Sequence, residues 1–187
     1  SKAINIINAL VTAQTTAVTP TLADGTNSYN KLYSNTLQNC NYGIVLNGYA
    51  ASTPFSLGDT GNDVGGVSVL TGNTILNYGG GGTSNPAAGI RATNQWGVNV
   101  SFNTINNNNG SGINHAATIR GIYAQSGTSA NATINNNTIS LKGGATTSQV
   151  SAIENAIGST AASNTVTINN NLIQDCSYST GTSGTFY

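Results

Sequence analysis

The sequence predicts an all-β solenoid, a parallel β-helix of about five coils with irregular loops between its strands. Three observations predict this fold class. A short text of the form N-[TL]-[IL] recurs along most of the chain, and aliphatic residues alternate with polar residues around it. No segment shows the 3.6-residue periodicity of an amphipathic helix.

The asparagine of the recurring text marks one coil each time. It stands at Asn35, Asn73, Asn103, Asn137 and Asn171, so successive markers are 38, 30, 34 and 34 residues apart. Intervals of this size are typical of solenoids in which each repeat is one coil. We expect the coils to occupy residues 29–176. Residues 1–28 then form an irregular leading segment or partial first coil, and residues 177–187 the start of an unfinished coil or a tail.

Aliphatic residues keep a fixed distance from each marker. Three positions before it stand Leu32, Leu70, Val100, Ile134 and Ile168. Two positions after it stand Leu37, Ile75, Ile105, Ile139 and Ile173. Four positions before it the residues are mostly polar: Lys31, Val69, Asn99, Thr133 and Thr167. Alternation with a period of two is typical of a strand with one buried face, so we expect two short strands joined by a bend at the marker.

A third strand is predicted between markers. Four segments place an isoleucine directly after a small residue: 42–46, 88–92, 120–124 and 151–155. Three short strands per coil, each with an aliphatic side chain pointing inward, give coils that stack at about 4.8 Å. An asparagine at a bend bonds local backbone, and its amide can also bond the asparagine of the next coil. The five markers are therefore predicted to form an asparagine ladder.

The text V-x-I-x-N-N-x-I with a following G-I resembles the parallel β-helix repeat of pectate-lyase-like and NosD-like proteins, over roughly residues 29–176. The resemblance implies a right-handed coil. The richness in Asn and Thr resembles a segment of a Bacteroidota cell-surface adhesin. Relatives of this kind that cleave polysaccharides work from an exposed strand face, with a calcium-binding acidic cluster in the lyases and several close Asp residues in the hydrolases.

Charge is scarce along the whole chain. Five Lys and Arg balance five Asp and Glu, and charged residues make up 5% of the sequence, against about 25% in an average globular protein. Nucleic acid and anionic membranes are recognised by clustered Lys and Arg, so neither is predicted as a partner. No apolar stretch reaches 18 residues, so no membrane insertion is expected. The composition favours an extracellular protein, with flanking domains of the same polypeptide and surface glycans as partners.

The two cysteines, Cys40 and Cys176, each lie five positions after a marker, in the first and fifth coils. Four coil spacings of about 4.8 Å separate them by far more than the roughly 7 Å that a disulfide spans between Cα atoms. We predict two free, largely buried thiols.

The outward row beside the third strand offers one candidate ligand site. It contains Arg91, Tyr123 and Glu154, which suggest a glycan-binding patch, with a surface cation–π contact and a solvated acid as the favoured alternative. Asp59, Asn62 and Asp63 suggest a calcium cup, with a Gly-rich turn and solvated acids as the favoured alternative. The lone histidine, His115, is interpreted as a solvated loop residue. No cofactor and no catalytic residue are predicted.

Three functions remain open at this point. The first is a non-catalytic extracellular module, either a stalk or an adhesive segment of a larger bacterial surface protein, favoured because the sequence shows no cluster of carboxylates and no catalytic triad. The second is a carbohydrate-active enzyme, or its glycan-binding remnant. The third is a phage-spike-like or filament-forming solenoid.

Overall fold

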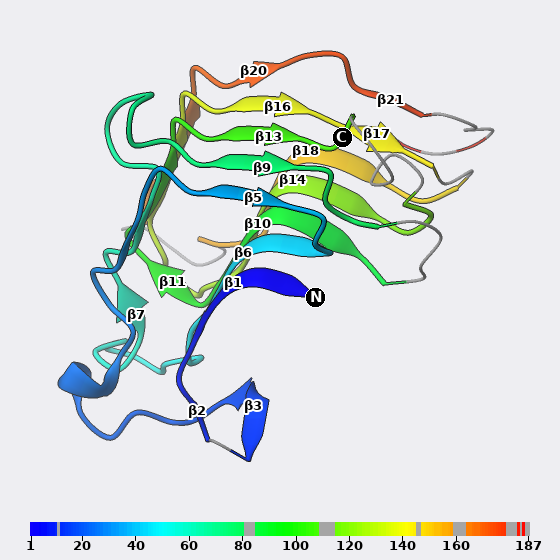
Figure 1. The fold of residues 1–187 in the computed structure, drawn as a ribbon. Helices are drawn as coiled ribbons and strands as arrows, with labels where there is room; N and C mark the ends of the chain where they lie inside the picture. The colour runs from blue at the N-terminus through cyan, green and yellow to red at the C-terminus, as the bar shows by residue number, and fades with distance from the viewer. Residues whose placement is uncertain are drawn as a thin grey trace.

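The computed structural model describes residues 1–10, 12–80, 85–108, 115–144, 147–158, 164–178, 183 and 185 of the chain. They form a parallel β-solenoid of about four turns, not the five coils expected, although each principal sheet has five strands. The coils stack from β1 and β5 at one end to β20 at the other (Figure 1). No helix among these residues has the length and hydrophobicity needed to cross a bilayer.

Three five-stranded parallel sheets run along the solenoid. Sheet I consists of β1 (Lys2–Ile7), β6 (Tyr42–Asn47), β10 (Ala87–Thr93), β14 (Ile119–Ser126) and β18 (Val150–Asn155). Sheet II consists of β4 (Lys31–Leu32), β8 (Asp63–Val64), β12 (Val98–Ser101), β15 (Ala132–Asn135) and β19 (Val166–Asn169). Sheet III consists of β5 (Thr36–Gln38), β9 (Thr74–Leu76), β13 (Thr104–Asn106), β16 (Thr138–Ser140) and β20 (Leu172–Ile173).

Short pairs complete the architecture. The strands β7 (Asp59–Thr60) and β11 (Gln95–Trp96) pair in parallel, as do β17 (Lys142–Gly143) and β21 (Ser177–Tyr178). Two strands, β2 (Ala9–Leu10) and β3 (Ala13–Ala17), form an antiparallel hairpin. This hairpin and the 3-10 turn η1 (Ala23–Gly25) lie below the first coil in the view of Figure 1. The strand β1 lies beside β6 and supplies the first strand of sheet I. Residues 179–182, 184 and 186–187 of the predicted tail lie outside the described residues.

The interior is filled by rows of aliphatic side chains, as predicted. In sheet I the row is Ile4, Ile44, Ile90, Ile122 and Ile153, each directly opposite the next. In sheet III the row is Leu37, Ile75, Ile105, Ile139 and Ile173. The central members of both rows are essentially fully buried. Each such side chain contributes about 1.5–3 kcal/mol on burial, so these rows supply most of the driving force for coiling.

The corresponding row of sheet II differs from the prediction in its second coil. Val64, and not Leu70, lies between Leu32 and Val100. Val64 is completely buried, whereas Leu70 is 84% exposed. The prediction for Leu70 is wrong because a loop at 65–72 separates the strand from its marker in this coil, so counting back three positions from Asn73 ends inside the loop.

The same loop displaces the outward row. Asp63, and not Val69, lies between Lys31 and Asn99. The loop is held in place by Thr71, whose hydroxyl donates to the Gly65 carbonyl at 2.6 Å. Val69 is 79% exposed on this loop.

The asparagine ladder runs unbroken through all five markers. Each of the first four markers donates from its backbone N and from Nδ2 to the Oδ1 of the marker in the next coil, over 2.8–3.1 Å. The Nδ2 of Asn73, Asn103 and Asn137 donates also to a backbone carbonyl of the preceding coil, at 2.8–2.9 Å. These three side chains are 1% exposed. The ladder therefore satisfies polar groups that the coil buries at its corner.

The bend lies one residue earlier than predicted. In four of the five coils the residue directly before the marker has left-handed backbone: Ser34, Phe102, Asn136 and Asn170, with φ between 51° and 61°. Gly72, before Asn73, is not among the residues with positive φ. The markers themselves are not among the residues with positive φ. The residue before the marker adopts the strained left-handed backbone conformation, so the marker itself can direct its amide along the coil axis.

The glycine before the isoleucine in the three inner strands of sheet I has a steric cause. A Cβ built on Gly43 would lie 2.5 Å from the carbonyl oxygen of Gly89 and 2.7 Å from Ile75 Cγ2. A Cβ on Gly89 or on Gly121 would meet the next coil and sheet III in the same way. Only a residue without a side chain fits at these positions, and the pairing of sheet I skips them.

Candidate functional site

The outer face of sheet I carries the side chains that the sequence assigns to a glycan patch. Arg91 of β10 lies opposite Val45 of β6 and Tyr123 of β14, and Tyr123 lies opposite Glu154 of β18. The predicted register of this row is confirmed. The partners that these side chains choose differ from the prediction.

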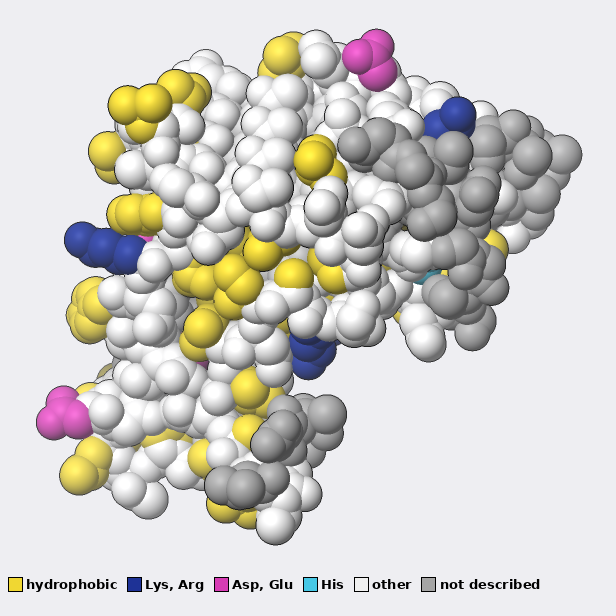
Figure 2. All heavy atoms as spheres, in the orientation of Figure 1, with side chains coloured by type: hydrophobic (Ala, Val, Ile, Leu, Met, Phe, Trp, Pro, Cys, Tyr) yellow, Lys and Arg dark blue, Asp and Glu magenta, His cyan; other side chains and the backbone are white. Residues whose placement is uncertain are grey.

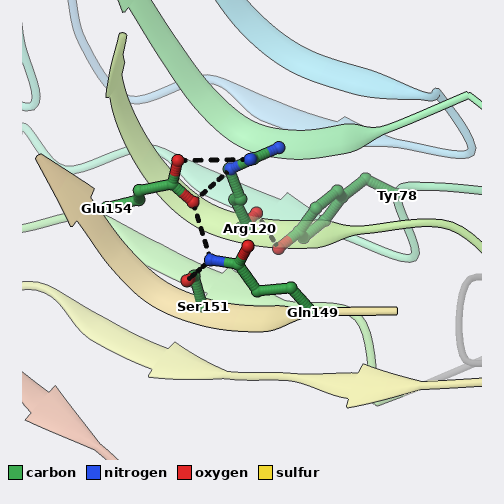
Figure 3. A network of polar contacts seen from close by, with 5 residues as sticks. All are labelled: Tyr78, Arg120, Gln149, Ser151 and Glu154. Atoms are coloured by element: carbon green, nitrogen blue, oxygen red, sulfur yellow. Dashed lines mark hydrogen bonds and ion pairs between the residues drawn. The ribbon is translucent and has the colours of Figure 1, made fainter. Parts of the chain in front are cut away.

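Glu154 forms an ion pair with Arg120, a residue that sequence reasoning did not single out. Arg120 donates from Nε to Glu154 Oε2 at 2.6 Å and from Nη2 to Oε1 at 3.2 Å (Figure 3). The Nε2 of Gln149 donates to the same Oε2 at 2.9 Å and to the Ser151 hydroxyl at 2.6 Å. The guanidinium of Arg120 also lies 4.2 Å from the centroid of the Tyr123 ring. Glu154 is therefore a neutralised, hydrogen-bonded acid and not a solvated one.

Arg120 belongs to a second row on sheet I: Lys2, Tyr42, Ala88, Arg120 and Ser151. This row stands two residues before the isoleucine row, where strict alternation would point the side chain inward. The skipped glycine breaks the alternation, because Gly121 takes the inward position between Arg120 and Ile122. In the sequence, the glycine between Arg120 and Ile122 was the feature that could have predicted the outward position of Arg120.

A buried phenol supports Arg120 from within. The Tyr78 hydroxyl donates to the Arg120 carbonyl at 2.6 Å (Figure 3), and the side chain of Tyr78 is fully buried in the core. Burial holds the pKa of Tyr78 well above its ordinary value of 10.0, so this phenol stays protonated and keeps donating.

Arg91 has a different environment from Arg120. Its guanidinium carbon lies 4.9 Å from the centroid of the Tyr42 ring. Its Nε is buried and has no hydrogen-bond partner, and the described part of the chain offers it no ion pair. Arg91 and Arg120 line a cleft of about 280 Å³ on the outer face of sheet I, with Tyr42, Tyr123, Gln125 and residues 86–88. The predicted contact between Arg91 and Tyr123 is replaced by two stacks, each with its own tyrosine.

The residues considered for calcium form hydrogen bonds with neighbouring protein groups. Asp59 is 1% exposed; its Oδ1 accepts from the Asn27 backbone N at 3.0 Å and its Oδ2 from Gln95 Nε2 at 3.2 Å. Asn62 Nδ2 donates to Gln95 Oε1 at 2.7 Å. Burial raises the pKa of the Asp59 carboxyl above its ordinary 3.8. The expectation of a solvated acid is wrong for Asp59, because the leading segment and β11 cover it.

Asp63 points into a separate environment on the outer face of sheet II. Its Oδ1 accepts from Asn99 Nδ2 at 2.7 Å and from the Gly66 backbone N at 3.0 Å, and its Oδ2 accepts from the Tyr33 hydroxyl. Asp59 and Asp63 thus serve two separate hydrogen-bond sets. Within the described ranges, no three His, Cys, Asp or Glu side chains come together as metal ligands.

Both cysteines are free, as predicted. Cys40 is buried and Cys176 is half-buried, and burial raises the pKa of both thiols above the ordinary 9.0. A raised thiol pKa leaves little thiolate at neutral pH. The structure therefore gives these side chains a packing role.

His115 is not a solvated loop residue. It is fully buried, its Nδ1 lies 3.3 Å from the Gly80 carbonyl, and its Nε2 is buried without a partner among the described residues. The prediction is wrong because the imidazole ring packs against Gly79 inside the protein. A Cβ at position 79 would lie 3.2 Å from His115 Cγ, so the glycine leaves room for the ring. The neighbouring residues 109–114 lie outside the described residues.

A second hollow lies beside the leading segment. It has a volume of about 480 Å³ and is lined by Asp24, Ser28, Tyr29 and Thr60 among others. Nearby, Trp96 stacks on Phe55 at 5.5 Å between ring centroids and donates from Nε1 to the Thr128 carbonyl at 3.0 Å. Trp96 is thus a packing residue, and Tyr29, 74% exposed, is the open aromatic surface here.

The fold and these contacts define the chain as a parallel β-solenoid protein with an arginine-lined cleft on one sheet. Compared with known protein families, curated proteins and solved structures, the chain matches none.

Proposed function

We propose that this chain is a non-catalytic extracellular module, a stalk or adhesive segment of a larger bacterial surface protein. The observation that carries the proposal is the unbroken interior. Three aliphatic rows and one asparagine ladder repeat through every described coil. Such a repeat makes a stiff rod, because each coil is bonded along its whole length to the next.

The surface suits a role outside the cell. On the face drawn in Figure 2 most side chains are neutral and the few charged ones are scattered. Neutral amides and hydroxyls keep their hydrogen bonds when pH and salt concentration change, whereas exposed ion pairs are screened by salt. We expect flanking domains of the same polypeptide, and surface glycans, as partners.

The arrangement of acids supports a role without catalysis. A glycosidase needs two carboxyl groups on either side of the scissile bond, one of them free to transfer a proton. Both oxygens of Glu154 are bound by Arg120, and Asp59 is buried and bonded to backbone and amide N–H groups. Neither side chain presents a free oxygen to a substrate.

The decisive experiment is incubation of the chain with pectins, alginates and host glycans, followed by detection of new reducing or unsaturated ends. We expect no turnover. Turnover that is abolished by Glu154→Gln or Arg91→Ala, but kept by the exposed control Asp175→Asn, would overturn the proposal in favour of a carbohydrate-active enzyme.

Two further measurements test the location and the assembly state. Antibodies against the chain should label intact cells of the source organism, and labelling only after permeabilisation contradicts a surface location. Light scattering and electron microscopy should show single rods. Filaments or trimers would instead favour the filament-forming or phage-spike-like alternative.

A further inference from the structure

The charges on the outer face of sheet I do not balance locally. The chain has five Lys and Arg, and three of them, Lys2, Arg91 and Arg120, lie on this sheet. Arg120 is neutralised by Glu154. The pKa of Lys2 is lowered by burial and then by the positive charge of Arg91, so the two cations lie close enough to repel each other. An excess of positive charge therefore remains around Arg91.

The guanidinium of Arg91 is held in place but left without an acceptor. The Tyr42 ring supports it at 4.9 Å, while its Nε–H, which is closed off from solvent, has no hydrogen-bond partner among the described residues. Buried N–H groups are nearly always paired, because an unpaired one costs free energy. Arg120 shows on the same sheet how such a group is satisfied, with Nε and Nη2 donating together to one carboxylate.

The space beside Arg91 is suited to a compact ligand. The cleft of about 280 Å³ is walled by the Tyr42 and Tyr123 rings and by residues 86–88, with Gln125 at its edge. Ligand sites for drug-sized molecules are about 300–1,000 Å³, so this one accepts a small molecule or the terminal group of a larger one. The rings provide apolar walls, and Gln125 provides a donor and an acceptor for hydroxyl groups.

We infer that this cleft binds the carboxylate of a small, purely anionic ligand, with the two terminal Nη groups of Arg91 donating to its two oxygens. A planar guanidinium fork matches a planar carboxylate in this bidentate geometry. A monoanion matches the single unpaired arginine. A zwitterion such as an amino acid is disfavoured, because its ammonium group would lie beside the unpaired positive charge of Arg91. This inference is independent of the scaffold role proposed above, which holds with or without a ligand.

The carboxylate can come from two sources, a free organic acid or the acidic terminal sugar of a glycan. The chain contains two arginines, Arg91 and Arg120, so a proton–nitrogen correlation spectrum shows two Nε–H signals and carries its own internal control. The variant Arg91→Lys assigns the two signals, because its spectrum lacks the Nε–H signal of Arg91. Propionate, glucuronate, sulfate and neutral glucose are titrated into the full chain at low, constant ionic strength.

We expect both acids to shift the Arg91 Nε–H signal in a saturable way and to leave the Arg120 signal in place, because Glu154 already occupies Arg120. Arg91→Lys, which keeps the charge and loses the fork, should weaken binding by about tenfold or more, measured by titration calorimetry because this variant lacks the Arg91 signal. Lys31→Gln, which removes a positive charge from β4 on another sheet, should change the affinity by less than about twofold. Circular dichroism confirms that both variants fold.

The outcomes separate the sources and test the inference. Glucuronate binding at least tenfold tighter than propionate, with glucose silent, supports the inference and identifies a sugar acid. Equal binding of both acids supports it and identifies free organic acids. Absence of a saturable shift, equal shifts of both arginine signals, or tighter binding of sulfate than of either carboxylate overturns the inference.

Discussion

Replacing Asn103 by alanine removes the central rung of the asparagine ladder. The side chain is 1% exposed and takes part in five hydrogen bonds. Its Oδ1 accepts from the backbone N of Asn73 at 3.1 Å and from Asn73 Nδ2 at 2.9 Å. Its Nδ2 donates to the Val64 carbonyl at 2.9 Å, to the Ser101 carbonyl at 3.1 Å and to Asn137 Oδ1 at 3.0 Å.

The expected loss of unfolding free energy depends on which neighbouring hydrogen-bonding groups still have a partner in the Asn103→Ala variant. Asn73 Nδ2 still donates to the Leu32 carbonyl, and Asn137 Oδ1 still accepts from the backbone N of Asn103. The backbone N–H of Asn73 is left buried and unpaired, which costs about 1–3 kcal/mol. The lost Nδ2 bonds add about 1 kcal/mol, so Asn103→Ala should lower the free energy of unfolding by about 2–4 kcal/mol.

Urea denaturation followed by far-ultraviolet circular dichroism measures this loss. The matched control is Asn171→Ala, which removes the half-buried last rung, so that water can take the place of the lost side chain. Its Oδ1 accepts two bonds from Asn137 and its Nδ2 donates to the Ile134 carbonyl. We expect a loss of about 0.5–1.5 kcal/mol for the control. A loss for Asn103→Ala no larger than that of the control refutes the reasoning.

The isosteric change Asn103→Asp tests whether direction matters. It keeps the acceptor toward Asn73 and puts a second oxygen where Nδ2 faced three acceptors. We expect the folded state to favour the protonated carboxyl, so the free energy of unfolding falls as pH rises and the variant is less stable than Asn103→Ala at pH 7. A pH-independent difference between the two variants argues against a directed ladder.

Three other predictions concern the core, a buried acid and the thiols. Gly89→Ala should lower the free energy of unfolding by about 1–3 kcal/mol, because the new Cβ would lie 2.6 Å from Ile105 Cγ2; an unchanged melting temperature contradicts this. The pKa of Asp59 is raised by burial, so the free energy of unfolding should fall as pH rises from about 3.8 through the raised folded pKa. The variant Asp59→Asn should flatten this pH dependence when the free energy is measured by urea titration at several pH values. Equal slopes for the variant and the original protein contradict the prediction. Iodoacetamide should alkylate half-buried Cys176 before buried Cys40 in the native protein, by mass spectrometry, and a reductant should leave the melting temperature unchanged; the reverse order or a lowered melting temperature contradicts the structure.

Counting from the marker asparagine predicted most of the interior rows but failed in one coil. The rows of sheets I and III are as expected because each strand keeps its distance from the marker or from the small residue before isoleucine. The failure at Leu70 has a local cause, since the loop at 65–72 lengthens the path between strand and marker. The polar–aliphatic pair Asp63 and Val64, which matches Lys31 and Leu32 of the first coil, was the available signal for the correct strand.

The candidate site was predicted only in part. The row of Arg91, Tyr123 and Glu154 follows from the repeat, but the choice of Arg120 as the partner of Glu154 does not. Side-chain pairing depends on the diagonal between coils and on Gly121, which takes the inward position beside Arg120. Neither is expressed in the spacing of any single row.

The sequence by itself determined the solenoid, its inward aliphatic rows, its ladder and its free cysteines, because these depend on features that recur at nearly constant intervals in every coil. Only the tertiary structure decided which side chains leave the periodic scheme. It buried His115 and Asp59, displaced Leu70 to the surface, and left Arg91 without an acceptor beside a cleft. The physical reason is that a periodic core is specified once per coil, whereas burial and charge pairing of a single residue depend on neighbours from other coils and loops.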